Sequence, residues 1–186
     1  MTNKTRVIVG LLLTIAVFLA ATFLGRELAP EAGFFAYSFP THTLMLVLSI
    51  ALILTLKKQL TYKFAWPSWR RIGKPLLLGL LTTVIVNVLM SFLTVIFGGE
   101  IEAHPAADRM TVFQMFAFVL IYASIAEEFL FRGFLMNLLR PLNTKAVRVL
   151  KKKISVPVLI SGIAFGMAHL ILLVSGSDGF LVLRTV

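Results

Sequence analysis

The sequence predicts an all-α membrane protein, a polytopic bundle of at least five transmembrane helices with a cytoplasmic N-terminus. Hydrophobic residues make up 59% of its 186 residues and the mean hydropathy is +0.94, whereas a soluble domain averages about 45–50% apolar residues. The apolar residues lie in runs of roughly 20, the length that crosses the hydrocarbon core of a bilayer. The short loops between these runs alternate in charge.

Five spans follow one another along the chain, so we expect residues 1–186 to form a single membrane domain. The apolar run after Lys4 and Arg6 is longer than the core of a signal peptide, about 7–15 residues, which favours a retained first helix. Pro40 stands in the first turn of the second span, where its missing N–H is harmless. The expected spans are 7–25, 39–56, 75–97, 111–139 and 156–174.

The loop charges predict the orientation of these spans. Basic residues collect before the first span, after the second and after the fourth, while the other loops hold most of the acidic residues. Lys and Arg accumulate on the cytoplasmic side of membrane proteins. We therefore expect a multi-pass protein of the cell membrane, in a bacterium the plasma membrane. The net charge of +10 follows from this topology, and the partner it indicates is the lipid bilayer and not nucleic acid.

The last residues begin a new apolar run. Residues 175–179 read Ser-Gly-Ser-Asp-Gly, a loop composition, and the run at 180–186 follows directly. It is too short to span a bilayer, which takes about 20 residues. We expect 180–186 to be the start of a further helix in a chain that is truncated at its C-terminus.

Three ionisable residues stand inside the fourth span: Glu127, Glu128 and Arg132. Each costs about 2.5–3.5 kcal/mol at the centre of a membrane helix, and such groups usually face a protein interior or a watery cavity and mark function. Glu128 and Arg132 are four residues apart, so they share a face and can pair. Glu127 lies about 100° away around the helix and stays available as a general base toward water.

The fifth span offers a partner for these carboxylates. Gly162, Phe165, Gly166 and His169 follow helical spacing and line one face, and the two glycines form a small-xxx-small pair that lets another helix approach closely. At 1.5 Å per residue, Glu127 and His169 both lie roughly 18–20 Å from the basic edge of their helices. The spacing predicts two carboxylates and an imidazole at a common depth. Alternatively, the polar groups only hold the helices together.

These residues resemble the motifs of a known family. Glu127-Glu128-x-x-x-Arg132, followed by Gly133, resembles the first motif of the CPBP intramembrane proteases, which include the CAAX prenyl endopeptidases and the bacterial Abi-type proteins linked to bacteriocin processing and self-immunity. Phe165-x-x-x-His169 resembles the second motif, on the next helix. The family-like catalytic region is 111–174.

The resemblance implies an intramembrane endopeptidase that cleaves a peptide or membrane-protein substrate. Glu127 would activate a water with the support of Glu128. Arg132 would hold the glutamate pair in place, and His169 would position the water or stabilise the oxyanion. Phe165 and Gly166 would support the site. The family's third motif, a His with an Asn or Asp about four residues later on a later helix, has no counterpart after His169.

No cofactor is predicted. The chain has no cysteine, which excludes thiolate ligands and a cysteine nucleophile, and it has no His-Glu-x-x-His helix. Glu127, Glu128 and His169 could supply three ligands to a divalent metal such as zinc, but Arg132 beside them disfavours a cation. We therefore prefer a glutamate-activated water without metal.

Two functions of other classes stay open. The first is a catalytically silent membrane protein that binds a peptide or serves in bacteriocin self-immunity. The second is a proton-coupled transporter with Glu127, Glu128 and His169 as relay. The sequence lacks the pair of broken helices in corresponding halves that is typical of many transporters.

Overall fold

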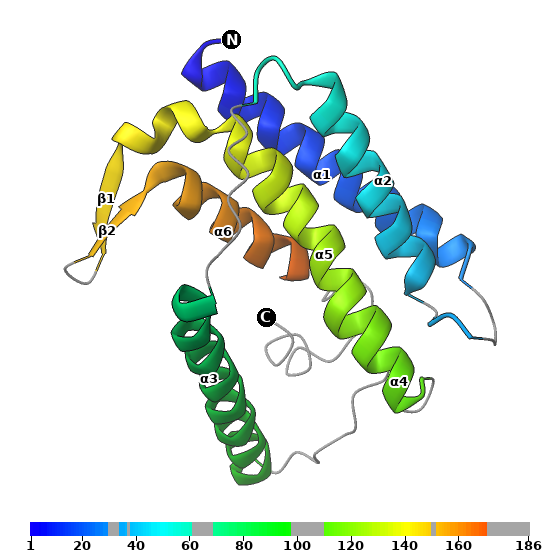
Figure 1. Ribbon diagram of the computed structural model, residues 1–186. Coiled ribbons are helices and arrows are strands. Elements are labelled where there is room, and N and C mark those ends of the chain that lie inside the picture. The colour runs from blue at the N-terminus through cyan, green and yellow to red at the C-terminus, as the bar shows by residue number, and fades with distance from the viewer. Residues whose placement is uncertain (30–33, 37, 61–68, 98–109, 150–151, 171–186) are drawn as a thin grey trace. The chain divides into compact units, whose positions relative to one another are not determined.

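A computed structural model describes residues 1–29, 34–36, 38–60, 69–97, 110–149 and 152–170 (Figure 1). These residues belong to two compact units, one from Met1–Tyr62 and Ala106–Ala168, the other from Lys63–Pro105 and His169–Val186. Each unit is described by itself. The predicted helix start at 180–186 and the end of the fifth predicted span, at 171–174, lie outside the described residues.

The regular secondary structure of the described residues is helical apart from one short β-hairpin, in agreement with the predicted helical fold class. The fourth predicted span is one continuous helix, Val112–Met136, in which α-helical turns alternate with wider π-helical turns; we call it the composite helix. The elements are α1 (Asn3–Glu27), α2 (Phe39–Thr55), α3 (Trp69–Ile96), α4 (Val112–Gln114), π-helix Met115–Ala123, α5 (Ser124–Glu127), π-helix Glu128–Met136, 3-10 helix Arg140–Thr144, β1 (Ala146–Val149), β2 (Lys152–Ser155) and α6 (Val156–Leu170).

Three of the helices are long and apolar enough to cross a membrane: Asn3–Glu27, Leu77–Ile96 and Val112–Met136. The other two predicted spans are shorter apolar helices, α2 with 17 residues and α6 with 15. The helical fold class and three candidate spans are thus confirmed. The full number of five spans and the cytoplasmic N-terminus stay predictions.

Local sequence explains where the helices of the first unit begin. The Thr5 N–H donates to Thr2 Oγ1 at 3.2 Å, which caps α1. Thr111 and Gln114 form a capping box at the start of the composite helix: the Thr111 N–H donates to Gln114 Oε1 at 2.8 Å, and the Gln114 N–H donates to Thr111 Oγ1 at 3.2 Å. Pro40 stands in the first turn of α2, as predicted.

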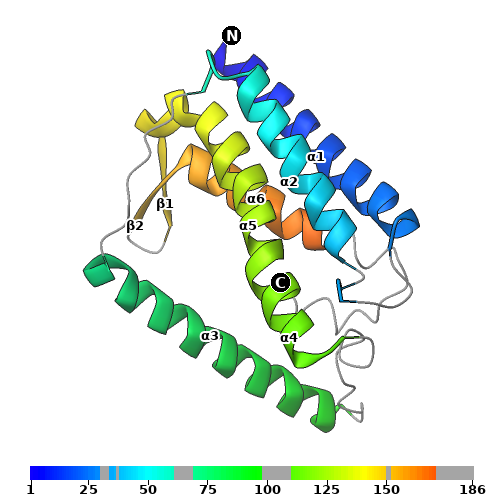
Figure 2. The ribbon, with the colours of Figure 1, turned by 45° about the vertical axis from the view of Figure 1, so that its right-hand side comes forward.

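The first unit packs α1 against α2 along a seam of small residues. The buried positions of α1 recur every three or four residues, as one helix face requires, and they are Gly10, Thr14, Val17, Ala21 and Gly25. The backbones meet most closely at Gly25, where an added Cβ would lie 2.5 Å from Thr41 Cα. Figures 1 and 2 show the two helices side by side along their length.

The core of this unit lies around the second half of the composite helix. Leu130, Phe134, Leu135 and Leu138 there are fully buried, and they pack with residues of α1 and α2 in one hydrophobic cluster. Leu135 and Leu138 reach α1 at Gly10, where an added Cβ would meet their methyl groups at 3.0 and 3.3 Å. The composite helix is therefore held by one face, opposite to the face that carries its charges.

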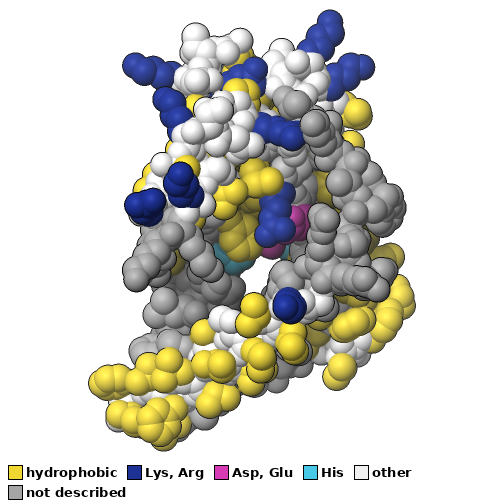
Figure 3. Space-filling model, turned by 60° about the vertical axis from the view of Figure 1, so that its left-hand side comes forward, with side chains coloured by type: hydrophobic (Ala, Val, Ile, Leu, Met, Phe, Trp, Pro, Cys, Tyr) yellow, Lys and Arg dark blue, Asp and Glu magenta, His cyan; other side chains and the backbone are white. Residues whose placement is uncertain are grey.

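One arginine ties three helix ends together. The Arg6 guanidinium, near the start of α1, donates to the carbonyl oxygens of Gln59 at 2.9 Å and Leu138 at 3.2 Å. Gln59 follows α2, and Leu138 lies in the helical turn that continues the composite helix. The start of the first span and the ends of the second and fourth spans thus lie at one end of the unit, which we call the basic end; dark blue Lys and Arg side chains gather at the top of Figure 3.

The basic loop after the fourth span contains a hairpin that the sequence analysis did not predict. Strands β1 and β2 pair antiparallel with the register Ala146↔Ser155, Val147↔Ile154, Arg148↔Lys153 and Val149↔Lys152. Alternating Val and Ile positions suit a strand. The basic residues between them are equally typical of a cytoplasmic loop, which is why the hairpin was not predicted. The hairpin joins the composite helix to α6.

In the second unit, α3 is the main described element. It begins at Trp69, six residues before the predicted start of the third span at 75, and includes the basic pair Arg70 and Arg71. Its apolar residues are exposed within the structure, among them Leu77, Ile85 and Phe92. This exposure suits a helix in contact with lipid.

Candidate active site

The glutamate pair stands where the composite helix changes its hydrogen-bond pattern. Glu127 is the last residue of α5 and Glu128 is the first of the π-helical segment Glu128–Met136. The sequence analysis assumed a regular helix of 100° per residue, and the π-helical turns, which hold more residues per turn, correct this assumption. Such turns are rare and frequently occur at functional sites.

Glu128 and Arg132 form the predicted ion pair. Arg132 Nη1 lies 3.1 Å from Glu128 Oε1, and the two side chains are 69% and 50% exposed respectively. An exposed pair of this spacing contributes about 0.3–0.5 kcal/mol. Its main effect is therefore to fix the orientation of the Glu128 side chain, and not to stabilise the fold.

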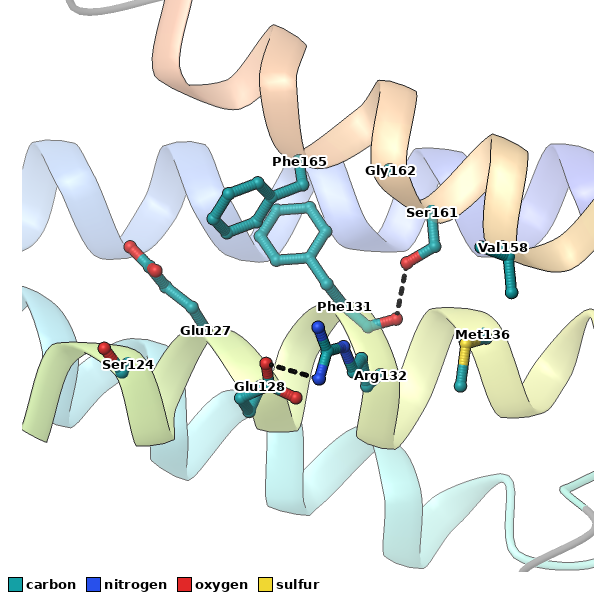
Figure 4. A pocket seen from close by; sticks show the side chains of 10 residues that line it. All are labelled: Ser124, Glu127, Glu128, Phe131, Arg132, Met136, Val158, Ser161, Gly162 and Phe165. Atoms are coloured by element: carbon teal, nitrogen blue, oxygen red, sulfur yellow. Dashed lines mark hydrogen bonds and ion pairs between the residues drawn. The ribbon is translucent and has the colours of Figure 1, made fainter. Parts of the chain in front are cut away.

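Glu127 differs from its neighbour in its surroundings. It is half-buried, whereas Glu128 is exposed. Figure 4 shows the Glu127 carboxylate directed away from the Glu128–Arg132 pair. The two neighbouring carboxylates thus differ in burial and in direction.

The two glutamates line a pocket between the composite helix and α6. Its volume is about 290 Å³, close to the lower limit of small-ligand sites, about 300 Å³. The composite helix supplies the charged groups of the pocket wall, and the lining residues from α6 are mostly apolar (Figure 4). The lining residues are Ser124, Glu127, Glu128, Phe131, Arg132, Met136, Val158, Ser161, Gly162 and Phe165.

Aromatic packing joins the two helices at this pocket. The rings of Phe131 and Phe165 meet edge to face, with centroids 5.2 Å apart and an interplanar angle of 83°. Such a pair is worth about 0.5–1.5 kcal/mol beyond its buried area. The predicted supporting residue Phe165 thus brings α6 against the helix of the first motif.

Side chains bind three successive carbonyl groups just after the glutamates. Ser161, buried on α6, donates from Oγ to the Phe131 oxygen at 2.9 Å. Asn137 donates from Nδ2 to the Arg132 oxygen at 2.8 Å and to the Gly133 oxygen at 3.2 Å. These bonds satisfy carbonyls of the widened helix and fix α6 to the turn that carries Arg132.

The sequence analysis missed Ser161, Asn137 and Phe131. Ser161 had a usable signal, because it lies four residues before Phe165 and eight before His169, on the same helical face. Asn137 and Phe131 had none, since a polar residue near a helix end and one more phenylalanine in an apolar run are ordinary in membrane helices.

No described helix approaches the two glycines of α6, so the predicted close packing at these positions stays a prediction. A Cβ added to Gly162 or Gly166 would meet no described atom within 4 Å, so neither glycine brings two described helices together. Gly162 instead lines the pocket, and Gly166 does not. The reason is that α6 meets the composite helix through Ser161 and Phe165, which leaves the glycine side open.

His169 lies in the last turn of α6. Its contacts assign it to the second unit, which begins again at this residue. The matched depth of His169 and Glu127 therefore stays a prediction.

The carboxylates do not fit a metal centre by themselves. Within the described ranges, no three His, Asp or Glu side chains gather closely enough to hold an ion, whereas a catalytic zinc usually takes three protein ligands. The Arg132 guanidinium, 3.1 Å from Glu128, also occupies the place where a cation would bind. We derive no step through a metal.

Comparison with known proteins covers the region of the site. Residues 109–185 match a family model described as type II CAAX prenyl endopeptidase Rce1-like. This region contains the composite helix, the hairpin, α6 and both sequence motifs. Searches of curated proteins and of solved structures found no match. The predicted resemblance to the CPBP family is thereby confirmed over residues 109–185, which are similar to the Rce1-like CAAX prenyl endopeptidases.

Proposed function

We propose that this chain is an intramembrane endopeptidase that hydrolyses peptide bonds with a water activated by Glu127. The observation that supports it best is the difference between two adjacent carboxylates at one pocket. Glu128 is exposed and paired with Arg132 at 3.1 Å, and Glu127 is half-buried and directed away from that pair (Figure 4). Two carboxylates in unlike surroundings can divide charge stabilisation and proton transfer between them.

The proposed reaction uses Glu127 as base and then as acid. Its carboxylate accepts a proton from water while the water oxygen bonds to the carbon of the scissile carbonyl. The resulting oxyanion collapses, the C–N bond breaks, and Glu127 returns the proton to the leaving nitrogen. Proton transfer of this kind contributes about 10²–10⁴-fold to a rate.

The other residues keep their predicted roles in this proposal. Glu128 supports Glu127, and Arg132 holds the pair in position through its ion pair. His169 positions the water or stabilises the oxyanion. The pocket supports a peptide segment as substrate, since the Phe131–Phe165 side offers apolar contacts and the charged side admits water.

We further propose a multi-pass arrangement of five spans in a cell membrane, in a bacterium the plasma membrane, with the N-terminus in the cytoplasm. The contacts of Arg6 with Gln59 and Leu138 support it, because they join three segments that the alternating charges assign to one side. Single cysteines in this cysteine-free chain can test it in intact cells. A membrane-impermeant thiol reagent should label Leu28→Cys and not Thr2→Cys; the reverse result would refute the orientation.

The activity is tested with the full chain in lipid nanodiscs and a library of membrane-tethered reporter peptides. The parent should cleave some members, and Glu127→Gln should lower the rate by about 10²–10⁴-fold. His169→Ala should also be impaired. Glu27→Gln is the matched control, since it makes the same change at the last residue of α1, which does not line the pocket. This variant should cleave like the parent.

Two results would overturn the proposal. Full activity of Glu127→Gln and His169→Ala would exclude the assigned mechanism. Retention of peptides by the parent without cleavage of any library member would favour the silent binding or self-immunity function.

A further inference from the structure

The β1–β2 hairpin presents basic and apolar side chains on opposite faces. Side chains alternate between the two faces of a strand, and the register sets Arg148 opposite Lys153 and Val147 opposite Ile154. Arg148 and Lys153 are both exposed, and Val147 is 43% exposed. The Arg148–Lys153 pair thus gives one face a positive charge, and the apolar Val147–Ile154 pair lies on the other face, which also carries the position of Lys152.

This arrangement is unfavourable for an isolated hairpin in water. Like charges directly opposite one another destabilise a strand pair, and a lone two-stranded hairpin is marginal in itself. The described acidic residues are Glu27, Glu127 and Glu128, and all three belong to helices. Since no described acidic residue lies in the hairpin or in the 3-10 helix before it, an anionic partner is expected from outside the described chain.

The position of the hairpin indicates which anion is near. It connects the composite helix to α6, which begins directly at Val156, and the Val156 N–H donates to the Lys145 oxygen at 3.0 Å. The composite helix is long and apolar enough to cross a membrane. A segment at the end of such a helix lies beside the lipid headgroups, where juxtamembrane Lys and Arg are attracted to anionic lipids.

We propose that the hairpin binds anionic phospholipid at the membrane surface, with Arg148 and Lys153 on the phosphate and the Val147 face toward the acyl boundary. Arginine binds phosphate oxygens with two parallel hydrogen bonds, and a face with both basic and apolar side chains suits the interface. Within the first unit, the hairpin projects away from α1 and α2 (Figures 1 and 2). The inference depends on membrane location and not on proteolysis.

The experiment uses the absence of cysteine in the chain. Val147→Cys is labelled with an environment-sensitive fluorophore, and the full chain is placed in nanodiscs of phosphatidylcholine alone or with about one third phosphatidylglycerol. The emission should shift to the blue only with the anionic lipid. The shift should fade as salt approaches about 1 M, where charges are screened beyond about 3 Å.

Charge-matched variants distinguish lipid binding by the hairpin from the general electrostatic attraction between the basic end and anionic lipid. Arg148→Gln with Lys153→Gln should abolish the shift, and the removal of a like-charge pair should not unfold the hairpin. Lys57→Gln with Lys58→Gln removes the same charge from exposed residues that follow α2 at the same end, and the shift should persist. An equal loss in both double variants would overturn the proposal.

Two further outcomes would also overturn it. Equal emission in the two lipid mixtures would mean that the hairpin does not contact anionic lipid. A blue shift with soluble polyglutamate as large as the shift with phosphatidylglycerol would indicate an acidic protein as partner instead.

Discussion

The composite helix has two faces, and they differ in almost every physical respect. On one face, Leu130, Phe134, Leu135 and Leu138 are fully buried against α1 and α2. On the other, Arg132 and Glu128 are 69% and 50% exposed beside the pocket. The same helix therefore has one face that is packed in the core and one face that is exposed at the pocket. Substitutions on the buried face should change stability, and substitutions on the pocket face should change activity.

The largest expected effect on stability is at the buried face. Phe134→Ala should lower the free energy of unfolding by about 3–5 kcal/mol, because it removes a fully buried ring and leaves a cavity. The apparent Tm in detergent measures it. Phe129→Ala on the same helix is the control, since Phe129 is 37% exposed, and it should cost far less. Equal losses would contradict the two-face description.

The next largest change in stability is expected at Gly25, and Gly162 serves as the comparison. Gly25→Ala should destabilise by about 1–3 kcal/mol, because its Cβ would lie 2.5 Å from Thr41 Cα and push α1 from α2. Gly162→Ala should be neutral or stabilise by up to about 1 kcal/mol, since alanine favours a helix and meets no described atom within 4 Å there. Thermal unfolding of both variants should give opposite signs. A destabilised Gly162→Ala would support the original prediction of close helix packing at this glycine.

A smaller effect is expected at the contact between α6 and the widened turn. Ser161→Ala should cost about 1 kcal/mol, because the buried Phe131 carbonyl loses the hydroxyl that donates to it at 2.9 Å. Ser124→Ala is the control: Ser124 also lines the pocket, but its hydroxyl donates within its own helix, to the Leu120 oxygen. Tm differences in detergent measure both. An unchanged Tm in Ser161→Ala would show that this bond does not hold the two helices together.

The smallest effect on stability is expected at the ion pair, with a large effect on activity. Arg132→Gln should cost no more than about 0.5 kcal/mol of stability but should lower peptide cleavage by about 10²-fold, because the glutamate pair loses its orientation. Arg26→Gln, an exposed arginine at the end of α1, is the matched control for both measurements. A variant that unfolds, or one that cleaves normally, would remove Arg132 from its proposed role.

Much of the site could be predicted from local spacing. The i, i+4 spacing of Glu128 and Arg132 predicted an ion pair, and the structure has it at 3.1 Å. The spacing on the fifth span likewise predicted Phe165 on the face toward the fourth span. Such predictions succeed because neighbours on one helix depend only on helical geometry.

Other features could not be predicted this way. Two helical glycines behave differently: Gly25 lies against Thr41, and Gly162 lines a pocket. The sequence does not distinguish them, because the distance to the next backbone depends on where large side chains separate the helices. The hairpin was missed for a related reason, since its pairing joins residues across a loop whose composition is typical of any basic cytoplasmic segment.

By itself, the sequence determined that the chain is helical and suited to a membrane, that Glu128 pairs with Arg132, and that two motifs resemble those of the CPBP family. Those properties follow from composition and from spacing within single helices. The tertiary structure decided which face of the composite helix is buried, that its turns widen at Glu128, and that Ser161 and Phe165 enclose a pocket of about 290 Å³. These depend on how separate helices fill the space between them, because side-chain packing is a property of the contact and not of either helix alone.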